Sequence, residues 1–453
     1  MHRRIALILP ILVFRLFAQE EAGSEAVMKH ILERLDGLEK ENQELIQEVR
    51  NLRKELDSSR AAKSIVPDSN QTEKPSLEER VSVEEQRTAE QAQTKVEASH
   101  KFPIQLDGML LFNAFANSTY KPTESPSDYG LLTGPSQSGA TLRQTLLGLE
   151  LLGPSLPGGG RVNGSLMMDF WAGYPDPGSN WLRLRRADVS LDWTNRSFSV
   201  GQDKPLISPR QPDSLAEVGI PPLAGSGNLW LWLPQARYEE RLHFGANSGI
   251  TGQLAVIQTK EDYATIPSAY SGFVEKARPG LEGRFAFWHS FDDTRKFEFA
   301  PGFHISTSRV AGNPVKSRIG SLDWLVVPAS HLKFSGTVFS GQDVAGLGAL
   351  GNGFTIDSYG RARPIKSSGG WAQIALPVTN RLTFNFSSGL ENNRADYMNP
   401  SATVRNWTYA SNLMYRLGPN VIFSLEGLQI RTRLFSGQNE IHNHYDLALA
   451  YLF

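Results

Sequence analysis

The chain has no cysteine, no long apolar run and no excess of either charge. The absence of Cys from its 453 residues excludes disulfide scaffolds, zinc ribbons and thiolate catalysis. No window supplies the ~18 continuous apolar residues that a membrane-spanning helix needs. The formal net charge of −1 argues against a strongly basic nucleic-acid-binding protein, and the mean hydropathy of −0.31 argues against a polytopic helical membrane protein.

The balanced charge conceals two unlike pieces. Residues 1–100 carry 15 Lys and Arg against 19 Asp and Glu, whereas residues 101–453 carry 31 against 28. The basic start and the apolar run Ile5–Phe14 predict a secretory signal peptide over residues 1–18. Arg15 and Leu16 are atypical there, so a retained membrane anchor or a wrongly assigned start is the alternative. Export of a chain without Cys is typical of a bacterial envelope protein.

A heptad repeat follows the signal peptide and predicts a coiled coil over residues 25–57. Eight of nine seam positions are apolar, with Met28, Leu35, Asn42, Val49 and Leu56 at a and Ile31, Leu38, Leu45 and Leu52 at d. Asn42 is the usual kind of register-fixing residue, at a cost in stability. A single helix packed on another domain is the alternative. Residues 58–101 are too polar to bury a core, which predicts a flexible linker.

From residue 102 to the end, the hydrophobic period changes from 3.5 to 2, which predicts an all-β domain. Phe297, Phe299, Phe303 and Ile305, for example, alternate with charged or small residues. We predict sixteen strands of about 10 to 13 residues, a length suited to tilted strands that cross a bilayer. Their ranges are 104–117, 141–152, 161–171, 181–193, 197–203, 230–242, 248–259, 277–290, 296–309, 316–327, 331–342, 368–377, 381–391, 404–417, 420–432 and 441–453.

The connections between these strands alternate in length. Tight turns such as 194–197 and 328–330 contrast with long loops rich in Gly, Pro, Ser and Asn at 118–140, 203–229, 258–276, 342–367 and 392–403. This alternation predicts an outer-membrane barrel with short periplasmic turns and long external loops. Trp and Tyr near strand ends predict interfacial girdles; they are Trp171, Trp181, Trp193, Trp230, Trp232, Trp324, Trp371 and Tyr451. A secreted soluble multi-sheet protein is the alternative.

Two kinds of motif carry a resemblance to known families. The last strand, Tyr445–Phe453, has a terminal Phe453 and apolar residues including Tyr451 at alternate positions, and it resembles the C-terminal assembly signal of bacterial outer-membrane proteins. The segments 143–150, 201–202, 234–238, 369–373, 383–385 and 409–420 are similar, in order, to the DcaP-like trimeric outer-membrane transporters. That resemblance implies a porin-like barrel, a trimer and an N-terminal coiled coil, although the heptads alone equally fit a dimer.

In a porin-like barrel, the loop 203–229 between strands five and six would fold inward and narrow the channel. Arg183 and Arg185 share one face of a regular strand and Arg186 takes the other, so all three point inward only if a β-bulge intervenes. Because the Arg fork matches carboxylates, a mild preference for small organic anions such as dicarboxylates is one hypothesis, and an unselective pore is the other. The candidate channel residues are Asp203, Lys204, Arg210, Asp213 and Glu217 in the loop and Arg143, Arg161, Arg183, Arg185, Arg186, Arg237 and Arg284 on the wall.

The sequence therefore predicts a non-enzymatic outer-membrane channel for passive diffusion of small hydrophilic solutes. Its expected partners are outer-membrane lipid, the barrel-assembly machinery and copies of itself, with no nucleic acid and no cofactor. His442 and His444 share a strand face, but two ligands do not make a metal site. The alternative function is a structural anchor whose coiled coil tethers a periplasmic or cell-wall partner.

Overall fold

The structure is a computed structural model that describes residues 104–119, 134–173, 180–260, 272, 274–275, 277–310, 312–351, 353–396 and 398–453. The predicted signal peptide, the predicted coiled coil with Asn42 and the predicted linker lie outside the described residues. Among the described residues, no helix has both the length and the apolar character to span a membrane.

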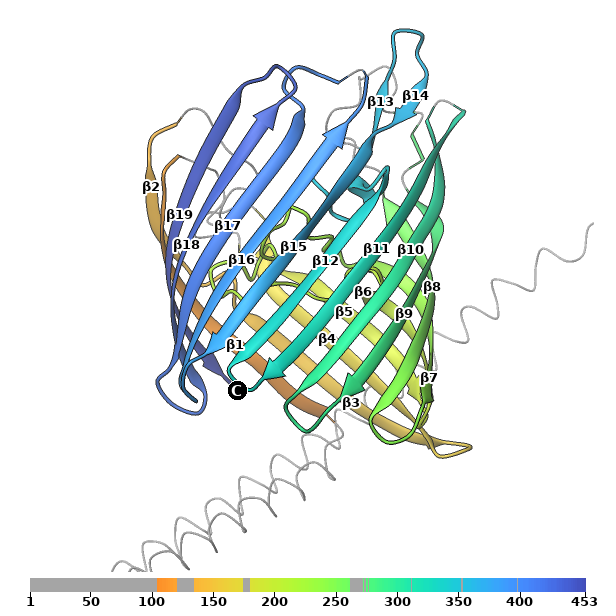
Figure 1. The fold of residues 1–453 in the computed structure, drawn as a ribbon, viewed down its shortest axis with the longest axis vertical. Helices are drawn as coiled ribbons and strands as arrows, with labels where there is room; N and C mark the ends of the chain where they lie inside the picture. The colour runs from red at the N-terminus through yellow and green to blue at the C-terminus, as the bar shows by residue number, and fades with distance from the viewer. Residues whose placement is uncertain are drawn as a thin grey trace, which may run out of the picture. The chain divides into compact units, whose positions relative to one another are not determined.

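The described part of the chain is almost entirely β-strand (Figure 1). The elements in chain order are β1 (Ile104–Asn117), β2 (Gln137–Thr141), β3 (Leu146–Leu156), β4 (Gly160–Ala172), β5 (Trp181–Asp192), β6 (Arg196–Asp203), β7 (Leu233–His243), β8 (Ser248–Lys260), β9 (Ala277–Ser290), β10 (Lys296–Val310), β11 (Asn313–Ala329), β12 (Leu332–Gln342), the short helix η1 (Ala345–Leu347), β13 (Phe354–Ile356), β14 (Ala362–Pro364), β15 (Lys366–Pro377), β16 (Leu382–Arg394), β17 (Thr403–Arg416), β18 (Val421–Leu434) and β19 (Asn439–Leu452).

These strands close into one antiparallel barrel. Consecutive strands pair around the wall, and β1 pairs with β19 to close it. Both β2 and β3 pair with β1, at residues 113–117 and 104–109 respectively, so together they fill one position in the wall. Since β13 and β14 form a separate hairpin, the barrel has sixteen strand positions. The predicted sixteen-stranded antiparallel barrel is confirmed.

Three details differ from the prediction. The strand predicted at 141–152 is interrupted between Thr141 and Leu146, where the Thr141 hydroxyl accepts a hydrogen bond from the Arg143 N–H (3.1 Å). The strand predicted from residue 230 begins at Leu233 because the preceding residues belong to the loop. The loop predicted at 342–367 contains η1 and the β13–β14 hairpin, which projects above the barrel rim (Figure 1).

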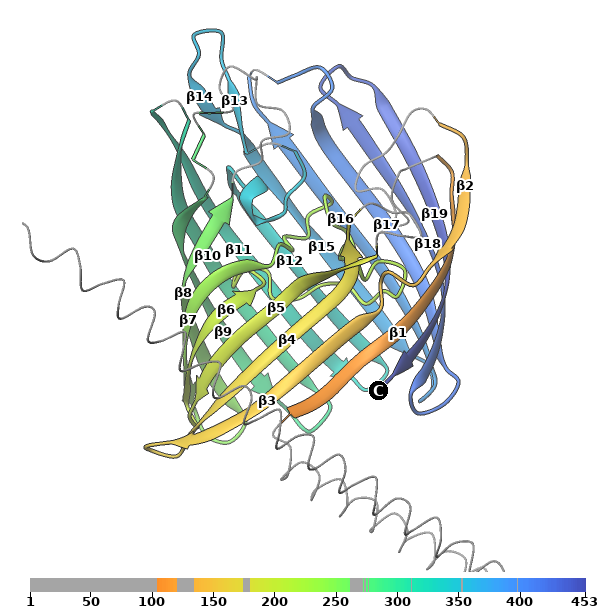
Figure 2. The ribbon, with the colours of Figure 1, turned by 180° about the vertical axis from the view of Figure 1, so that it is seen from behind.

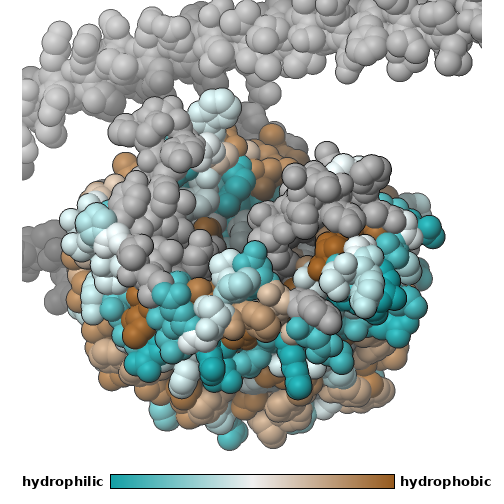
Figure 3. Space-filling view, turned by 90° about the horizontal axis from the view of Figure 1, so that it is seen from above, coloured by the Kyte–Doolittle hydropathy of each residue, from teal (hydrophilic) through white to brown (hydrophobic). Residues whose placement is uncertain are grey.

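The wall separates two chemistries by strand alternation. Inward side chains are polar and buried, as Asn385 and Asn412 are, whereas outward ones such as Phe386 and Leu425 remain exposed on the apolar outer wall. Figure 3 views this wall and its rim from the long-loop end. The interfacial placement predicted for Trp171 and Trp371 is wrong, because both are buried at positions that share the inward parity of Asp169 and Gln373.

The C-terminal residue closes the sheet against β1. Phe453 and Gly108 exchange two backbone hydrogen bonds of 3.1 and 3.2 Å. A Cβ atom on Gly108 would lie 2.6 Å from the Phe453 ring, so only glycine leaves room for that ring. Tyr451 is on the outer wall, stacked near Phe453 with ring centroids 6.4 Å apart.

Candidate channel interior

The third long loop, residues 204–232 between β6 and β7, folds into the barrel at mid-height (Figures 1 and 2). Its first half is bonded to successive wall strands. The Leu206 N–H donates to Glu282 on β9 (2.7 Å), and the Arg210 guanidinium forms ion pairs with Asp323 on β11 and, at 2.7 Å, with Glu298 on β10. The Asp213 N–H then donates to Gln373 on β15 (2.6 Å). These bonds hold the loop inside the barrel. The sequence predicted this inward fold.

Gln144 anchors the middle of the loop. Its side-chain oxygen accepts hydrogen bonds from the N–H groups of Val218 and Gly219, both at 2.7 Å, and its amide nitrogen donates to the carbonyl of Ala216 (2.9 Å) and to Asn113 (3.0 Å). Gln144 reaches the loop because it lies in the break between β2 and β3, where the three consecutive residues 143–145 are all buried. One buried amide thus satisfies three backbone groups of the loop.

The second half of the loop lies against β15–β17 through backbone contacts. Asn406 donates to the Gly225 carbonyl (2.9 Å). A Cβ atom on Gly227, whose φ is +92°, would lie 2.4 Å from Gly370, and one on Gly389 would lie 2.1 Å from the Ser226 carbonyl. Glycine is therefore required on both sides of this approach.

The arginine cluster on β5 points into the barrel as a group. Met167 pairs with Arg186 and Met168 with Leu184, so Arg185 is an extra residue in a β-bulge. The bulge that the sequence analysis required is present. Arg186 contacts Glu150 at 3.3 Å and Asp188 at 3.4 Å.

Arg183 and Arg185 both contact the Asp169 carboxylate and the Trp232 ring. Both form ion pairs with the fully buried Asp169, at 2.5 and 3.5 Å. Their guanidinium carbons lie 5.3 and 4.5 Å from the ring centroid of Trp232, within cation–π range. Two cations beside one carboxylate leave a net positive charge that the Trp232 ring stabilises. Trp232 is thus a lumen residue, and its predicted place in an interfacial girdle is wrong.

Arg185 and Arg186 line a cavity of about 560 Å³ between the loop and the wall. Five cationic side chains and one acidic side chain border it, and these are Arg185, Arg186, Lys204, Arg237 and Arg284 with Asp203. Its other walls include Met109, Leu146 and Met167. The cavity therefore combines a cationic side with an apolar side.

Lys204 enters the cavity from the beginning of the loop. Its ammonium group donates to Gln211. Burial and, to a lesser extent, the positive charge of Arg185 lower the pKa of Lys204 to about 8, and Asp203 opposes this. Arg237 contacts Asp203 at 3.5 Å and donates to the Lys204 carbonyl (3.1 Å).

Arg284 belongs to a separate ion-pair network below the loop. It donates to both oxygens of Asp323 at 2.7 and 2.9 Å and forms an ion pair with Glu298. Arg210 from the loop contacts the same two carboxylates. Two arginines and two acids are balanced in charge, so this network chiefly fixes the loop.

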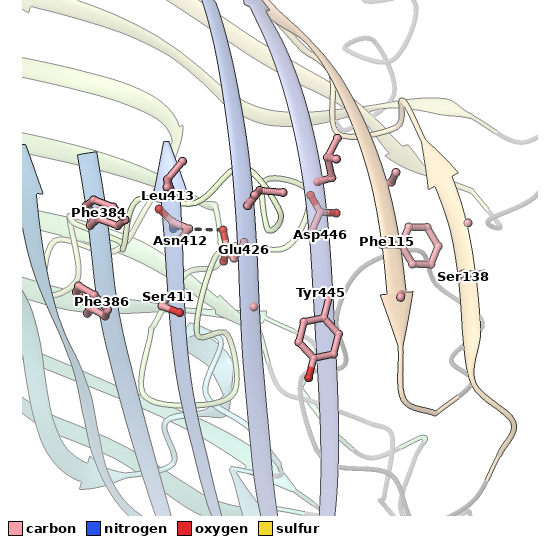
Figure 4. Close-up of a pocket in the computed structure, with 16 residues that line it drawn as sticks. Phe115, Ser138, Phe384, Phe386, Ser411, Asn412, Leu413, Glu426, Tyr445 and Asp446 are labelled. Atoms are coloured by element: carbon pink, nitrogen blue, oxygen red, sulfur yellow. Dashed lines mark hydrogen bonds between the residues drawn. The ribbon is translucent and has the colours of Figure 1, made fainter. Parts of the chain in front are cut away.

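The acidic side chains on the opposite wall are occupied by the loop. Ser214 donates to Glu426 (2.7 Å), and Asn113 donates both to Asp446 (3.0 Å) and to the Leu215 carbonyl (2.8 Å). Figure 4 shows Asn412 bonded to Glu426, at 3.3 Å, with Asp446 on the neighbouring strand. Both acids are only 6% exposed, so they contribute little exposed charge to the interior.

The remaining predicted residues lie apart from the cavity. Arg143 is buried and donates to the carbonyls of residues 170–173 at 3.2 to 3.3 Å. Arg161 is exposed at the short-turn end of β4, opposite Asp192. Asp213 accepts from Gln373 and Lys333, and Glu217 is buried in the loop.

Inward His442 and His444 each have a hydrogen-bonding partner. His442 contacts the Thr119 hydroxyl and His444 contacts the Asn117 amide, both at 2.7 Å. Within the residues described, no three His, Asp or Glu side chains form a group that could hold a metal ion. Both histidines therefore contribute to the polar lining of the wall.

Sequence reasoning missed Asp169, Gln144, Glu298 and Asp323 as parts of the interior. Asp169 and Asp323 lie on inward positions of alternating strands, so strand parity could have found them. Gln144 carried no such signal, because it sits where the strand is broken.

The comparisons with solved structures match this architecture. The outer-membrane channel DcaP of Acinetobacter baumannii superposes with a TM-score of 0.63 at 17% identity, covering 77% of this chain and 97% of that one. An anion-selective porin from Comamonas acidovorans gives 0.53 at 13% identity over 77% and 99% of the two chains. Salmonella typhi OmpF in complex with daunomycin gives 0.51 at 11% identity over 77% and 97%.

No protein-family model matches the sequence, and no curated protein matches it. The similarity therefore rests on the three-dimensional arrangement of the barrel. The chain has the sixteen-stranded fold of the outer-membrane porins, and this fold is similar to that of the DcaP channel.

Proposed function

We propose that this protein is an outer-membrane channel for passive diffusion of small hydrophilic solutes, with a preference for small organic anions such as dicarboxylates. The observation that carries the proposal is the cavity beside the third loop, with five cationic side chains and one acidic side chain on its border. Asp323 and Glu298 balance Arg284, so the positive field that a solute meets in the cavity comes from the arginine cluster on β5 and from Lys204.

The chemistry of the cavity favours carboxylates over simple halides. The planar fork of Arg can make two parallel hydrogen bonds to one carboxylate, and Arg186 and Arg237 both border the cavity. Met109, Leu146 and Met167 give a carbon skeleton an apolar surface to contact. One fold neighbour is itself described as an anion-selective porin.

The proposed location is the bacterial outer membrane, with the N-terminal segment in the periplasm. Short turns connect the strands at the end of the barrel where β1 begins and β19 ends, and short turns face the periplasm in such barrels. Residues 25–57 and the linker would then extend from the periplasmic side.

The pH dependence of ion selectivity tests the anion preference. Lys204 has a pKa of about 8, so it is charged below that pH and loses its charge above it, while the arginines stay charged. We expect the preference for chloride over potassium to fall between about pH 7 and pH 9, measured as the reversal potential across a planar bilayer.

Two variants separate Lys204 from other groups in this titration. Lys204→Arg should keep the low-pH selectivity at every pH, and Lys204→Gln should keep the high-pH value. A pH step that persists in both variants would contradict the assignment.

We propose in addition that the channel is a trimer formed through the outer face of β1, β2 and β16–β19. A shallow groove of about 980 Å³ lies there, and Figure 4 displays its lining residues. Phe386, Leu425 and Tyr445 contribute exposed apolar area, and Gly427 keeps part of the groove open. A second copy of the chain would cover this area.

A bulky residue in the groove should prevent assembly. A Cβ atom on Gly427 would meet only the Tyr445 ring at 3.5 Å, so Gly427→Trp fits the single barrel but fills the groove. We expect monomers in native mass spectrometry of the purified variant. Gly320→Trp is the matched control, because that outward glycine on β11 has no neighbour within 4 Å of an added Cβ; equal oligomers in both variants would refute this interface.

A further inference from the structure

A second group of cations lies on the outside of the barrel at the long-loop end. Eight exposed Lys and Arg side chains occupy outward positions near that end of β10, β11 and β15–β18. Their inward neighbours, such as Ser367, Asn393 and Asn406, are buried, which fixes the outward direction by strand alternation. The eight residues, here called the basic belt, are Arg309, Lys316, Arg318, Lys366, Arg394, Arg405, Arg431 and Arg433.

The strand register joins these cations into a nearly continuous row. Arg318 is opposite Gln342, which is opposite Lys366, which in turn is opposite Arg394. On the next strands, Arg405 is opposite Arg433. The belt is thus set by the pairing of strands far apart in the sequence.

Acidic residues near the belt are few. Glu275 lies opposite Arg309 and is paired with Arg278, and Asp357 and Asp396 border the same cavity as Lys366 and Arg394. No outward position of β10–β12 or β15–β18 holds Asp or Glu, and none of the eight cations forms an ion pair with another described residue. Arg405 and Arg431 have only neutral partners, which are Asn392 for Arg405 and Gln429 and the Tyr409 ring for Arg431. Like charges directly opposite each other, as in Lys366–Arg394 and Arg405–Arg433, destabilise a sheet, so an external anion would relieve the repulsion.

The position of the belt identifies the kind of anion. Directly toward the barrel middle on the same face lie exposed apolar side chains, such as Leu390 on β16 and Trp407 on β17. Figure 3 shows hydrophilic side chains along the near rim and hydrophobic ones on the wall beyond it. A ligand on this face therefore needs an apolar part beside the wall and a negative charge at the rim, which is the build of an anionic lipid.

The belt is confined to one part of the barrel. At the same end of β1, β2, β4 and β5 the outward residues are Ala116, Ser138, Ala172 and Leu182. If cations were a general feature of the long-loop rim, these four strands would carry them as well. The contrast indicates a surface specialised for contact with lipid headgroups on one side of the barrel.

We propose that the basic belt binds the phosphate groups of phosphorylated lipids in the outer leaflet. Arg and Lys donate strong charge-assisted hydrogen bonds to phosphate oxygens, and the row spans several strands, so one lipid with two phosphates can contact adjacent cations. The lipid chains lie on the apolar wall below. This site lies on the outer wall near the long-loop rim. None of its eight residues lines the groove proposed as the trimer interface, so the site is independent of the channel and of that interface.

The test measures binding of diphosphorylated lipid A to the purified full-length protein in neutral detergent by native mass spectrometry. Lys366→Gln, Arg394→Gln, Arg405→Gln and Arg433→Gln are combined in one variant, for which we expect roughly tenfold or weaker binding. The matched control removes one Lys and three Arg from the opposite end of the barrel, by Arg196→Gln, Lys296→Gln, Arg381→Gln and Arg416→Gln, and should bind within about twofold of the wild type.

A second comparison changes the lipid and leaves the protein intact. Wild-type protein should bind dephosphorylated lipid A much more weakly than the diphosphorylated form, and inorganic phosphate should compete poorly because it lacks the apolar part. Equal binding by the belt variant and the wild type, or equal binding of the two lipids, would overturn the proposal. A belt variant that changes oligomeric state but keeps its lipid affinity would also overturn it, in favour of a protein interface.

Discussion

Replacing Lys204 and Arg237 by glutamate is expected to abolish the preference of the channel for anions. Both side chains border the cavity, and the double substitution changes its border from five cations and one acid to three of each. A unit charge about 4 Å from a permeating ion contributes up to about 4 kcal/mol near a protein surface, reduced by salt. We expect the chloride-to-potassium permeability ratio to fall by roughly tenfold, measured from reversal potentials.

The matched control reverses one Lys and one Arg outside the cavity. Lys296→Glu with Arg416→Glu places the same charge change at exposed positions at the short-turn end, where we expect little effect on selectivity. Both variants should keep the heat-dependent gel mobility of a folded barrel. An unchanged permeability ratio in folded Lys204→Glu, Arg237→Glu protein would mean that permeating ions do not pass through this cavity.

Replacing Gln144 by alanine is expected to release the third loop and give a larger, noisier conductance. The substitution leaves the N–H groups of Val218 and Gly219 and the carbonyl of Ala216 without their buried partner, at about 1 to 3 kcal/mol for each unsatisfied group. The barrel wall keeps its own backbone pairing, so the loop yields first. Trypsin cleavage after Arg210 in the folded protein measures the release.

Gln144→Glu refines this test. A carboxylate at the same position can still accept from Val218 and Gly219 but cannot donate to Ala216 or Asn113, so its conductance and its cleavage rate should lie between those of the wild type and Gln144→Ala. If Gln144→Ala resists trypsin and conducts as the wild type does, Gln144 does not hold the loop.

Strand alternation made the barrel predictable. A period of two over sixteen segments, with short and long connections alternating, predicts a closed antiparallel sheet. The predicted ranges lie within a few residues of most observed strands. The same rule would have directed Trp171 inward, because it shares the parity of Asp169. The interfacial prediction for Trp171 was based on its position near a strand end and ignored its parity along the strand.

The interior was only partly predictable because its contacts join distant segments. An inward direction for both Arg185 and Arg186 implied a bulge. The bulge is present, because Met167 pairs with Arg186 and Met168 pairs with Leu184. Gln144 and Val218 are 74 residues apart, however, and no periodic pattern connects a residue in a broken strand with a loop. The charge of the interior depends on which acidic side chains the loop covers. The sequence does not show which ones these are, because they are set by the folded path of residues 204–232.

The ion selectivity of the purified wild-type protein tests the central claim most directly. In a planar bilayer with a KCl gradient at pH 7, we predict stepwise channel openings and a reversal potential whose sign corresponds to chloride as the more permeant ion. A folded barrel that gives no conductance would contradict the channel itself. A reversal potential of the opposite sign would leave the channel in place but contradict the role of the arginine-lined cavity.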